Sequence, residues 1–490
     1  MNLAQALRLL PPASLPSASL ESTPIFEAVA LVGSGGKTTA LFQLARQLPP
    51  PVILSASAHL HVDQIPLADS HWIANSPADL RELESRLQGV VLVSGPVEGT
   101  RTTGLDAPSM EWLRAVCERR GLPLLIEADG SRQRPLKAPG SDEPPIPEFV
   151  QTVVVTAGLS GLGQPLGEAF VHRPRAFARL SRLHPGDPIT PQVLARVLAH
   201  PRGGLKNIPP QARRLALLNQ ADTPELQAQA KTLAEQLLPA YQAVIIASLD
   251  PQASILDPQA SILDRQSSIP HLQSRIHAVH EPVAGIVLAA GESRRMGQPK
   301  QLLDYHGQPF VRAAAATALA AGLSPVIVVT GANAEAVEAA VRDLPARIVR
   351  NRDWPKGQGS SIRAGLADLT QPPPSLRDTS PKSFGYGGGR EGAAIFLLAD
   401  QPQVTTAVLR ALVERHSQDL APVVAPLVRG QRANPVLFDR LTFPALLKLS
   451  GDLGGRALFS QYPPAYLPWH DESLLVDADR PEDLEKLRDW

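Results

Sequence analysis

The feature that most constrains the fold is the stretch 285–300, where an apolar run of strand character turns through small residues and ends in cations. Small residues let the backbone approach a ligand closely, and consecutive N–H groups in such a turn form a concavity that binds anions. Arg294, Arg295 and Lys300 follow within one short loop and suit a polyphosphate. The alternative is an ordinary strand-to-helix turn with solvated arginines, but a later Ala-Asp-Gln-Pro sequence favours nucleotide binding. The residues expected to contact the nucleotide are Leu288, Ala289, Ala290 and Gly291.

Strand-like runs alternate with helical stretches along the whole chain, which predicts two α/β domains with largely parallel sheets. The 490 residues also exceed what a single core accommodates. We expect a first domain at 1–248, a repeat-containing linker at 249–281 and a second domain at 282–490. The repeat has a seven-residue period, but a proline in two of its units excludes a coiled coil. A linker of this length would let the two halves move independently.

Composition narrows the range of partners. The formal net charge is zero, with 47 basic and 47 acidic residues, so electrostatics gives no reason to expect nucleic acid or an anionic membrane. No run approaches the ~18 apolar residues of a membrane span, and the first ten residues do not form a convincing signal peptide. The single cysteine, Cys117, excludes intrachain disulfides and multi-cysteine metal sites. We therefore expect a cytoplasmic protein.

Residues 29–39 read as a strand, a glycine-rich loop and the start of a helix, which predicts a P-loop-like phosphate site. Such a loop aims backbone N–H groups and the helix N-terminus at an anion. Lys37 would supply a point charge and Thr38 a magnesium ligand. The loop is not a standard P-loop, because Leu31 stands where that motif has its first glycine, and a tight turn before a helix is the alternative. The glycines expected to contact phosphate are Gly33, Gly35 and Gly36.

Two further strand-like runs in the first half end in polar side chains. One ends in Glu127 and Asp129, and parallel strands deliver ligand-binding groups at such ends. Asp129 is the carboxylate expected to hold magnesium, with a turn or helix-capping aspartate as the alternative. The other ends in Asn219 and Asp222, similar to the base-reading Asn-Lys-x-Asp of GTPases, although Gln220 replaces the lysine. A strand-to-turn aspartate is the alternative there.

The second half contains two more candidate positions. Asp400 follows an apolar run that starts at residue 393, so a carboxylate is expected at a strand end. Gly357 and Ser361 open a predicted helix, another natural contact for phosphate or ribose. Residues 370–392 are rich in Pro, Ser and Gly and are expected to form a mobile insertion.

The sequence Leu288-Ala-Ala-Gly-Glu-Ser-Arg-Arg-Met-Gly-Gln-Pro-Lys300 resembles the signature loop of the MobA-like nucleotidyltransferases. Among these it is most similar to the molybdenum cofactor cytidylyltransferases. Guanylyltransferase relatives usually have glycine at the positions of Ala290 and Gln298, so the resemblance implies CTP rather than GTP. It covers about residues 282–490 and implies a Rossmann-like nucleotidyltransferase fold for this half.

This resemblance implies transfer of CMP from CTP to the molybdopterin cofactor, with release of pyrophosphate and with Mg²⁺ as the cofactor. Arg295 and Lys300 would neutralise charge on the leaving pyrophosphate, and Asp400 would hold the magnesium. In the family's closing motif Asp479 would complete the metal site, with Asp477 as the alternative. A nucleotidyltransferase that acts on a sugar- or alcohol-phosphate is the alternative function on the same fold.

The first half resembles the selenium-dependent hydroxylase accessory proteins (YqeC-like) over about residues 1–248. The shared motifs are Val-Gly-x-Gly-Gly-Lys-Thr-Thr, Glu-Ala-Asp-Gly, Pro-Leu-Lys-Ala-Pro and Val-His-Arg-Pro. The chain departs from the family at Asp142, where a histidine is usual, and at Ser55, which begins Ser-Ala-Ser-Ala in place of a threonine-rich stretch. The resemblance implies binding of ATP or GTP. The domain would be either an NTP-hydrolysing or kinase-like enzyme, or a nucleotide-gated module that serves a molybdenum hydroxylase apo-enzyme.

Overall fold

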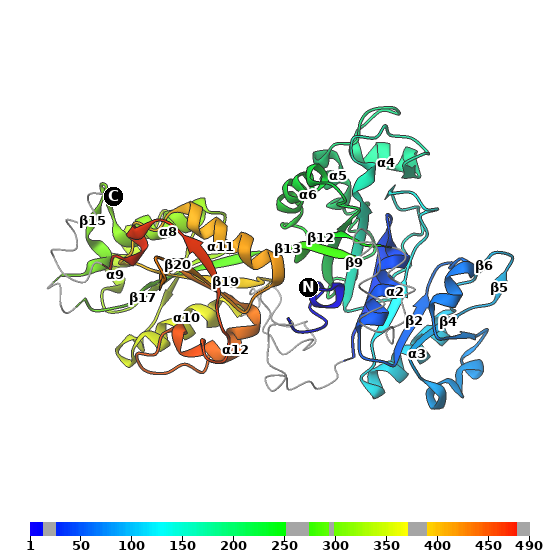
Figure 1. Cartoon of the computed structure of the whole chain (residues 1–490), viewed down its shortest axis with the longest axis horizontal. Coiled ribbons are helices and arrows are strands. Elements are labelled where there is room, and N and C mark those ends of the chain that lie inside the picture. Colours follow the sequence, from blue (N-terminus) through cyan, green and yellow to red (C-terminus); the bar gives the residue numbers. More distant parts are fainter. Residues whose placement is uncertain (13–25, 251–273, 294–297, 371–389, 478–490) are drawn as a thin grey trace. The chain divides into compact units, whose positions relative to one another are not determined.

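The computed structural model describes residues 1–12, 26–250, 274–293, 298–370 and 390–477. The chain divides into two compact units, Met1–His280 and Glu281–Trp490, each with its own sheet (Figure 1). Both units combine helices with a largely parallel sheet, which confirms the predicted α/β fold class. Among the helices of the described residues, none is both long enough and apolar enough to cross a membrane.

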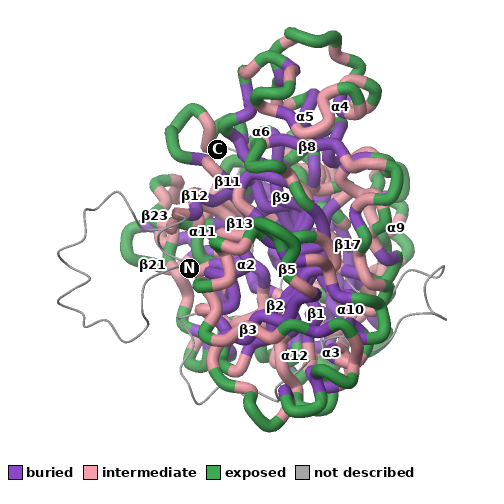
Figure 2. The backbone as a smooth tube through the Cα atoms, turned by 90° about the vertical axis from the view of Figure 1, so that its right-hand side faces the viewer, coloured by how far each residue is buried: buried purple, intermediate pink, exposed green. Residues whose placement is uncertain are grey.

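The first unit is built on a nine-stranded sheet in the order β13-β12-β11-β9-β1-β7-β2-β4-β3. Neighbouring strands are parallel except for β12 and β13, which are antiparallel. The central strands are buried along their whole length, as expected for a parallel sheet covered on both faces (Figure 2). The strands are β1 (Ala28–Gly33), β2 (Val52–Ala56), β3 (Ser70–Ile73), β4 (Val90–Ser94), β7 (Leu124–Glu127), β9 (Thr152–Gly158), β11 (Arg213–Asn219), β12 (Ala243–Ser248) and β13 (Arg275–His280).

Helices cover both faces of this sheet. One face packs against α3, α5 and α6, and the alternate residues of β1 face α2 on the other side. Two short ribbons lie outside the sheet: β5 (Val97–Glu98) pairs with β6 (Arg101–Thr102), and β8 (Leu136–Lys137) pairs with β10 (Val171–His172). The helices are α1 (Leu3–Ala6), α2 (Lys37–Gln47), α3 (Ala107–Arg120), α4 (Pro174–Ser181), α5 (Pro191–Leu198) and α6 (Pro224–Leu237).

The end of the expected linker forms part of the first unit. Residues Arg275–His280 form β13, which pairs with β12 at the edge of the sheet. The seven-residue repeats fall mostly within 251–273, outside the described residues. Since β14 begins at Val283, only Glu281 and Pro282 stand between the last strand of the first unit and the first strand of the second.

The second unit contains an eight-stranded sheet in the order β18-β17-β14-β19-β22-β20-β21, with β23 paired to β20. Strands β18, β17, β14 and β19 are parallel, whereas β22 runs antiparallel to both β19 and β20. The strands are β14 (Val283–Ala289), β17 (Val326–Thr330), β18 (Arg347–Arg350), β19 (Ala393–Leu398), β20 (Val423–Val428), β21 (Gln431–Arg432), β22 (Val436–Asp439) and β23 (Ala465–Trp469).

Helices α8, α9 and α11 cover one face of the second sheet, and α10 and α12 cover the other (Figure 1). A small ribbon, β15 (Asp304–Tyr305) with β16 (Gln308–Pro309), precedes α8. The helices are α8 (Phe310–Ala320), α9 (Ala334–Val341), α10 (Gln358–Thr370), α11 (Thr406–Asp419) and α12 (Phe443–Leu446). The expected insertion at 370–392 lies largely outside the described residues, which resume at residue 390.

Candidate functional site

In the second unit, the carboxylate of Asp400 lies beside the small-residue turn that follows β14. Strands β14 and β19 are parallel neighbours, with Leu288 opposite Leu398. The Ala399 N–H donates a hydrogen bond of 3.2 Å to the Leu288 carbonyl. The two chain ends therefore leave the sheet side by side, at the carboxyl edge where open α/β sheets bind their ligands. Ala289 and Ala290 are buried in this turn, and Gly291 is exposed.

Side-chain hydrogen bonds join the two ends of the signature loop. Ser293, whose φ is +59°, accepts a bond of 3.0 Å from the Lys300 N–H. Gln301 Nε2 donates to the Gly291 carbonyl at 2.6 Å. These contacts bring Lys300 back toward the start of the loop. Arg295 lies outside the described residues.

Lys300 and Asp400 form an ion pair in this turn. The Lys300 Nζ lies 3.8 Å from Asp400 Oδ2, and the lysine side chain is 11% exposed against 31% for the aspartate. The two groups that the sequence assigned to charge neutralisation and metal binding are thus neighbours. A lysine this buried beside a partly exposed carboxylate provides a positive charge in a region of low dielectric, where it interacts more strongly than in water.

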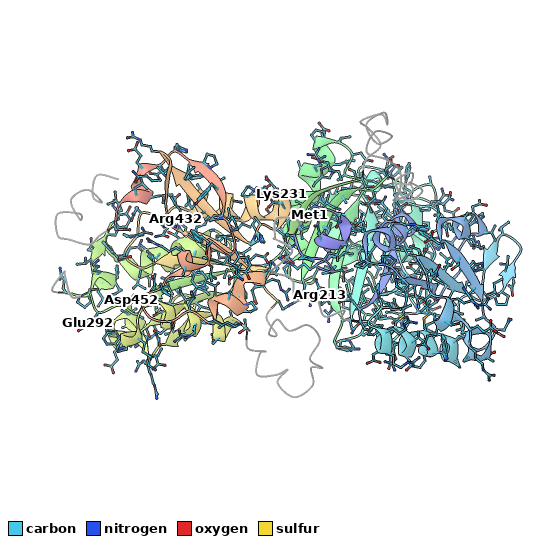
Figure 3. The ribbon with its side chains drawn as sticks, turned by 60° about the horizontal axis from the view of Figure 1, so that its bottom comes forward. Met1, Arg213, Lys231, Glu292, Arg432 and Asp452 are labelled. Atoms are coloured by element: carbon cyan, nitrogen blue, oxygen red, sulfur yellow. The ribbon has the colours of Figure 1, made fainter. Side chains whose placement is uncertain are left out.

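A cavity of about 200 Å³ opens beside Asp400. Asp477 lines the same cavity, so two carboxylates face one space, whereas Asp479 lies outside the described residues. Arg432, marked in Figure 3, has its guanidinium carbon 5.0 Å from the ring centre of Phe459. The remaining lining residues are mostly apolar or able to donate hydrogen bonds: Leu288, Gln358, Ile362, Phe396, Leu398, Asn434, Val436, Phe438, Leu446, Gly454, Gly455 and Arg456.

The start of α10 is fixed by close packing. Gly357 has φ +94°, and a Cβ there would lie 2.4 Å from Oδ1 of Asp452, which is also marked in Figure 3. The Ser361 hydroxyl accepts a hydrogen bond of 3.1 Å from Asn351 Nδ2. Gly357 and Ser361 therefore fix the backbone at the start of α10, while the neighbouring Gln358 lines the cavity.

In the first unit, the glycine-rich loop packs tightly against the end of β9. A Cβ on Gly33 would lie 2.2 Å from the Thr156 carbonyl oxygen, and one on Gly35 would lie 2.2 Å from the Gly158 nitrogen. Both glycines have positive φ, +94° and +77°. Gly36, at φ +114°, is the N-cap of α2. Close packing and backbone conformation both require glycine here, and they present the N-terminus of an 11-residue helix at the strand end.

The cation of this loop is held by carboxylates of the neighbouring strand end. Lys37 is 4% exposed, its Nζ donates to the Gly33 carbonyl at 2.8 Å, and it lies 3.3 Å from Asp129 Oδ1. The Gly33 N–H donates to both oxygens of Asp129 at 3.1 Å. Thr38 Oγ1 donates to Glu127 at 3.0 Å. Asp129 thus accepts the hydrogen bond of the Gly33 amide and pairs with the charge of Lys37. These are the two contacts that such a loop would offer to a phosphate.

A second lysine reaches the same carboxylate and was missed by sequence reasoning. Lys137, on β8, lies 2.7 Å from Asp129 Oδ2 and 2.7 Å from Glu143 Oε2. Arg173 donates to both oxygens of Glu143. Their motifs, Pro-Leu-Lys-Ala-Pro and Val-His-Arg-Pro, have no role that the sequence alone indicates, and the pairing of β8 with β10 brings them together.

These contacts shift the pKa values of the acids. Burial raises the pKa of Glu127, opposed by the Lys37 charge and the Thr38 hydrogen bond. Burial also acts to raise the pKa of Glu143, but the hydrogen bonds from Arg173 and Lys137 outweigh it and hold that pKa at about 2. Glu143 is therefore an ionised partner for both cations at neutral pH.

Asn219 and Asp222 occupy different environments. Asn219 is buried, with Nδ2 donating to the Gly35 carbonyl at 2.8 Å and Oδ1 accepting the Leu249 N–H at 2.9 Å. Both ends of its amide thus bind the protein backbone and hold the loop in place. Asp222 is exposed. In the part of the chain that the structure describes, no group of three or more His, Cys, Asp or Glu side chains is arranged to hold a metal ion.

A parallel α/β sheet with a small-residue turn and an adjacent strand-end carboxylate is the arrangement of a Rossmann-like nucleotide-binding unit. The family model of the MobA-like NTP transferase domain matches residues 285–465, and that of the YqeC protein matches residues 29–175. The chain therefore belongs to the MobA-like NTP transferases through its second half and to the YqeC family through its first. The recognition of both families from sequence motifs is confirmed.

Three curated relatives agree with this division. Nicotine blue oxidoreductase of Paenarthrobacter nicotinovorans is 33% identical over 215 residues, which are 42% of this chain and 96% of that protein. Purine catabolism protein PucB of Bacillus subtilis (strain 168) is 31% identical over 42% of this chain and 95% of its own. Uncharacterized protein YqeC of Escherichia coli (strain K12) is 32% identical over 39% of this chain and 75% of its own.

Proposed function

We propose that the second half transfers CMP from CTP to the terminal phosphate of a molybdopterin-type cofactor and releases pyrophosphate, acting in the cytoplasm. Its membership of the NTP transferases supports the reaction class. The observation that carries the proposal is the position of Asp400 beside the small-residue turn at 288–291. Its Oδ2 lies 3.8 Å from the Nζ of Lys300, and Asp477 lines the same cavity.

In this reaction an oxygen of the acceptor phosphate attacks the α-phosphorus of CTP in line. The bond from that phosphorus to the β-phosphate oxygen breaks, and its electron pair leaves with pyrophosphate. Lys300, together with Arg295, neutralises the charge that grows on the leaving group. The turn at Leu288–Gly291 holds the triphosphate through backbone N–H groups. Positioning and charge stabilisation carry most of the catalysis, since the protein forms no covalent intermediate.

The donor set suits Mg²⁺. This ion usually binds proteins through one or two carboxylates and takes its remaining oxygens from substrate phosphates and water. Asp400 with Asp477 provides such a pair, because both line the cavity, and Asp479 remains the candidate that the family resemblance implies. When bound, Mg²⁺ would neutralise charge on the triphosphate.

The cavity supports a flat, anionic acceptor. Phe396, Phe438 and Phe459 supply aromatic surface, and Arg432 and Arg456 supply positive charge. A pterin ring that carries a phosphate matches both features. A sugar- or alcohol-phosphate acceptor is the alternative, and it would use the arginines but gain less from three phenylalanines.

The test offers radiolabelled CTP, GTP and UTP to the full chain, with a molybdopterin-type cofactor or with sugar phosphates as acceptors. We expect label transfer from CTP to the pterin acceptor and release of pyrophosphate. Preferred transfer to a sugar phosphate would establish the alternative, and the absence of transfer with any pair would contradict the proposal.

A second candidate for the same half is a redox enzyme, because one relative over this half is named an oxidoreductase. Incubation of the full chain with reduced nicotinamide nucleotides and a dye acceptor, without CTP, separates the two. Dye reduction that persists in an Asp400→Asn variant would favour the redox function.

For the first half we propose a nucleotide-binding role that uses ATP or GTP, with Lys37, Thr38 and Asp129 at the phosphates and their Mg²⁺, and with Asn219 holding the loop. Asp222 is the remaining candidate for contact with the base. The unit would support maturation of a molybdenum hydroxylase apo-enzyme. Steady-state hydrolysis by the full chain and by its Lys37→Ala variant distinguishes an NTP-hydrolysing enzyme from a nucleotide-gated module, because a gated module turns over very slowly without its partner.

A further inference from the structure

The turn that follows β19 holds the segment that carries Asp477. Gln401 and Gln403 stand in this turn, and both are almost fully buried, at 3% and 5% exposure. The Nε2 of Gln403 donates to the carbonyls of Ser473 and Val476, at 3.0 and 2.7 Å. One glutamine thus fixes the backbone that leads directly into Asp477.

The other glutamine binds the Asp477 carboxylate itself. Gln401 Nε2 donates to Asp477 Oδ1 at 2.5 Å. A hydrogen bond to an ionised acceptor is short and stronger than one between neutral groups. The Gln401 Oε1 is buried and has no hydrogen-bond partner among the residues that the structure describes. Turning the amide over would place that oxygen against the carboxylate, so the amide must present its N–H₂ to Asp477.

This contact connects two carboxylates that line one cavity. Gln401 is joined to Asp400 by a peptide bond and to Asp477 by its side chain. Asp477 is exposed, so without this bond its carboxylate would sample several rotamers. We propose that Gln401 is a positioning residue that fixes Asp477 on the cavity of Asp400 and thereby makes Asp477 the second carboxylate of the metal site. The inference rests on the proposed function of the second half.

A merely structural role for Gln401 predicts something different. If the amide only tied the chain segment to the sheet, its loss would act in the same way whether or not residue 477 carries a charge. If it positions a metal-binding carboxylate, its loss should matter only while that carboxylate is present. A double-mutant cycle between the two positions separates these cases.

The experiment measures Mn²⁺ binding to the full chain by electron paramagnetic resonance, without nucleotide, for the wild type, Gln401→Met, Asp477→Asn and the double variant. Methionine keeps the length of glutamine and removes the donor. Asp400→Asn identifies which Mn²⁺ sites belong to this cavity. Gln461→Leu is the matched control, because that glutamine is exposed and its Nε2 donates to the hydroxyl of the neighbouring Tyr462 at 3.2 Å.

We expect Gln401→Met to weaken the site lost in Asp400→Asn by about 10- to 100-fold, the range for residues that orient metal ligands. Asp477→Asn should weaken it at least as much, and adding Gln401→Met to Asp477→Asn should change it by less than about twofold. Gln461→Leu should bind Mn²⁺ as the wild type does. If Gln401→Met does not fold, Gln401→Asn, one methylene too short for the bond, takes its place in the cycle.

Unchanged Mn²⁺ binding in a folded Gln401 variant would overturn the inference, and so would equal effects with and without the Asp477 carboxylate. In both cases the metal site of the proposed function would stand. If Asp400→Asn removes no Mn²⁺ site from the wild type, the proposed function itself fails, and the two failures are thereby distinguished.

Discussion

The Nζ of Lys137 lies 2.7 Å from the Oδ2 of Asp129. The Nζ of Lys37 approaches the other oxygen of this carboxylate at 3.3 Å. Both lysine side chains are at most 3% exposed, so one buried aspartate contacts two buried cations. The pairs must remain complete, because a buried charge that loses its partner retains its full desolvation cost.

Removal of the second lysine should therefore destabilise the first unit. Lys137→Met leaves Asp129 and Glu143 each with one cation fewer, and we expect a loss of about 3 kcal/mol in the free energy of unfolding. Urea denaturation followed by circular dichroism measures it. Arg86→Ala is the control, since Arg86 pairs with Glu82 in an ion pair whose side chains are 65% and 70% exposed. That change should cost less than about 0.5 kcal/mol. Equal losses in the two variants would contradict a buried, balanced cluster.

The stability of the first unit should depend on pH through His172. Burial, and then the charges of Arg173 and Lys137, lower the pKa of His172 from 6.5 to about 4. Between these values the unfolded chain binds more protons than the folded one, so stability falls as the pH drops through this window. His172→Gln should flatten the slope of melting temperature against pH between about 6.5 and 4, and the exposed His184→Gln should leave it unchanged. An identical slope in the wild type and His172→Gln would disprove this assignment.

The positions of the two small-residue turns could be predicted from the sequence because their signals are local. An apolar run, small residues and a following basic residue identify each one, and both lie at the ends of strands, β1 and β14. The position of Asp400 beside the second turn follows from a general rule about parallel sheets. That rule gives the edge of the sheet, whereas the closeness of Asp400 to the turn also depends on β14 and β19 being neighbours, which the alternation of strands and helices does not establish.

The remaining features depend on contacts between distant residues. The pairing of two-residue strands, which carry no periodic signal, brings Lys137 and Arg173 to the same acceptor, Glu143. Asn219 donates a hydrogen bond to a loop carbonyl 184 positions away. Its resemblance to a base-reading motif gives no indication of this contact, which holds the loop in place. The sequence places the residues of β13 in the linker because they follow the repeats, and the strand pairs only with β12 at the sheet edge.

The glycine-rich loop of the first unit should tolerate no side chain at Gly35. An alanine Cβ would lie 2.2 Å from the Gly158 nitrogen, at a backbone φ of +77°. Gly163 has a similar φ, +74°, with no atom within 4 Å of such a Cβ, so Gly163→Ala isolates the backbone strain from the clash. We expect Gly163→Ala to lower the free energy of unfolding by about 1 to 2 kcal/mol. Gly35→Ala should lower it further and should abolish binding of fluorescent ATP and GTP analogues. Normal nucleotide binding by Gly35→Ala would show that the loop does not contact phosphate.

Catalysis should depend on the charge of Asp400. Asp400→Asn keeps the size of the side chain and removes a proposed metal ligand, so transfer of CMP should fall by at least about 100-fold. The protein should remain folded with a modest fall in melting temperature, because the Asp400 side chain is 31% exposed but the 11% exposed Lys300 loses this ion pair. Asp353→Asn is the control: this aspartate is 58% exposed and pairs with Lys356 at 2.8 Å. Undiminished transfer by Asp400→Asn would exclude Asp400 as the metal-binding carboxylate.

Loss of the Arg432 side chain should weaken binding of the acceptor more than binding of CTP. Its guanidinium stacks over Phe459 at 5.0 Å, and both residues line the cavity beside Asp400. In the proposed complex the guanidinium donates to the acceptor phosphate, and a hydrogen bond to a charged group contributes about 1.5 to 3 kcal/mol. Arg432→Ala should therefore raise the KM of the acceptor by about tenfold and change the KM of CTP by much less.

Steady-state kinetics with each substrate varied in turn measures both constants for Arg432→Ala. The control is Arg347→Ala, whose arginine is 57% exposed and pairs with Asp368 on the same unit. A rise confined to the KM of CTP would place the nucleotide, and not the acceptor, against Phe459. The acceptor phosphate would then have to approach the α-phosphorus from the side of the small-residue turn at 288–291. That is the opposite of the proposed direction of in-line attack.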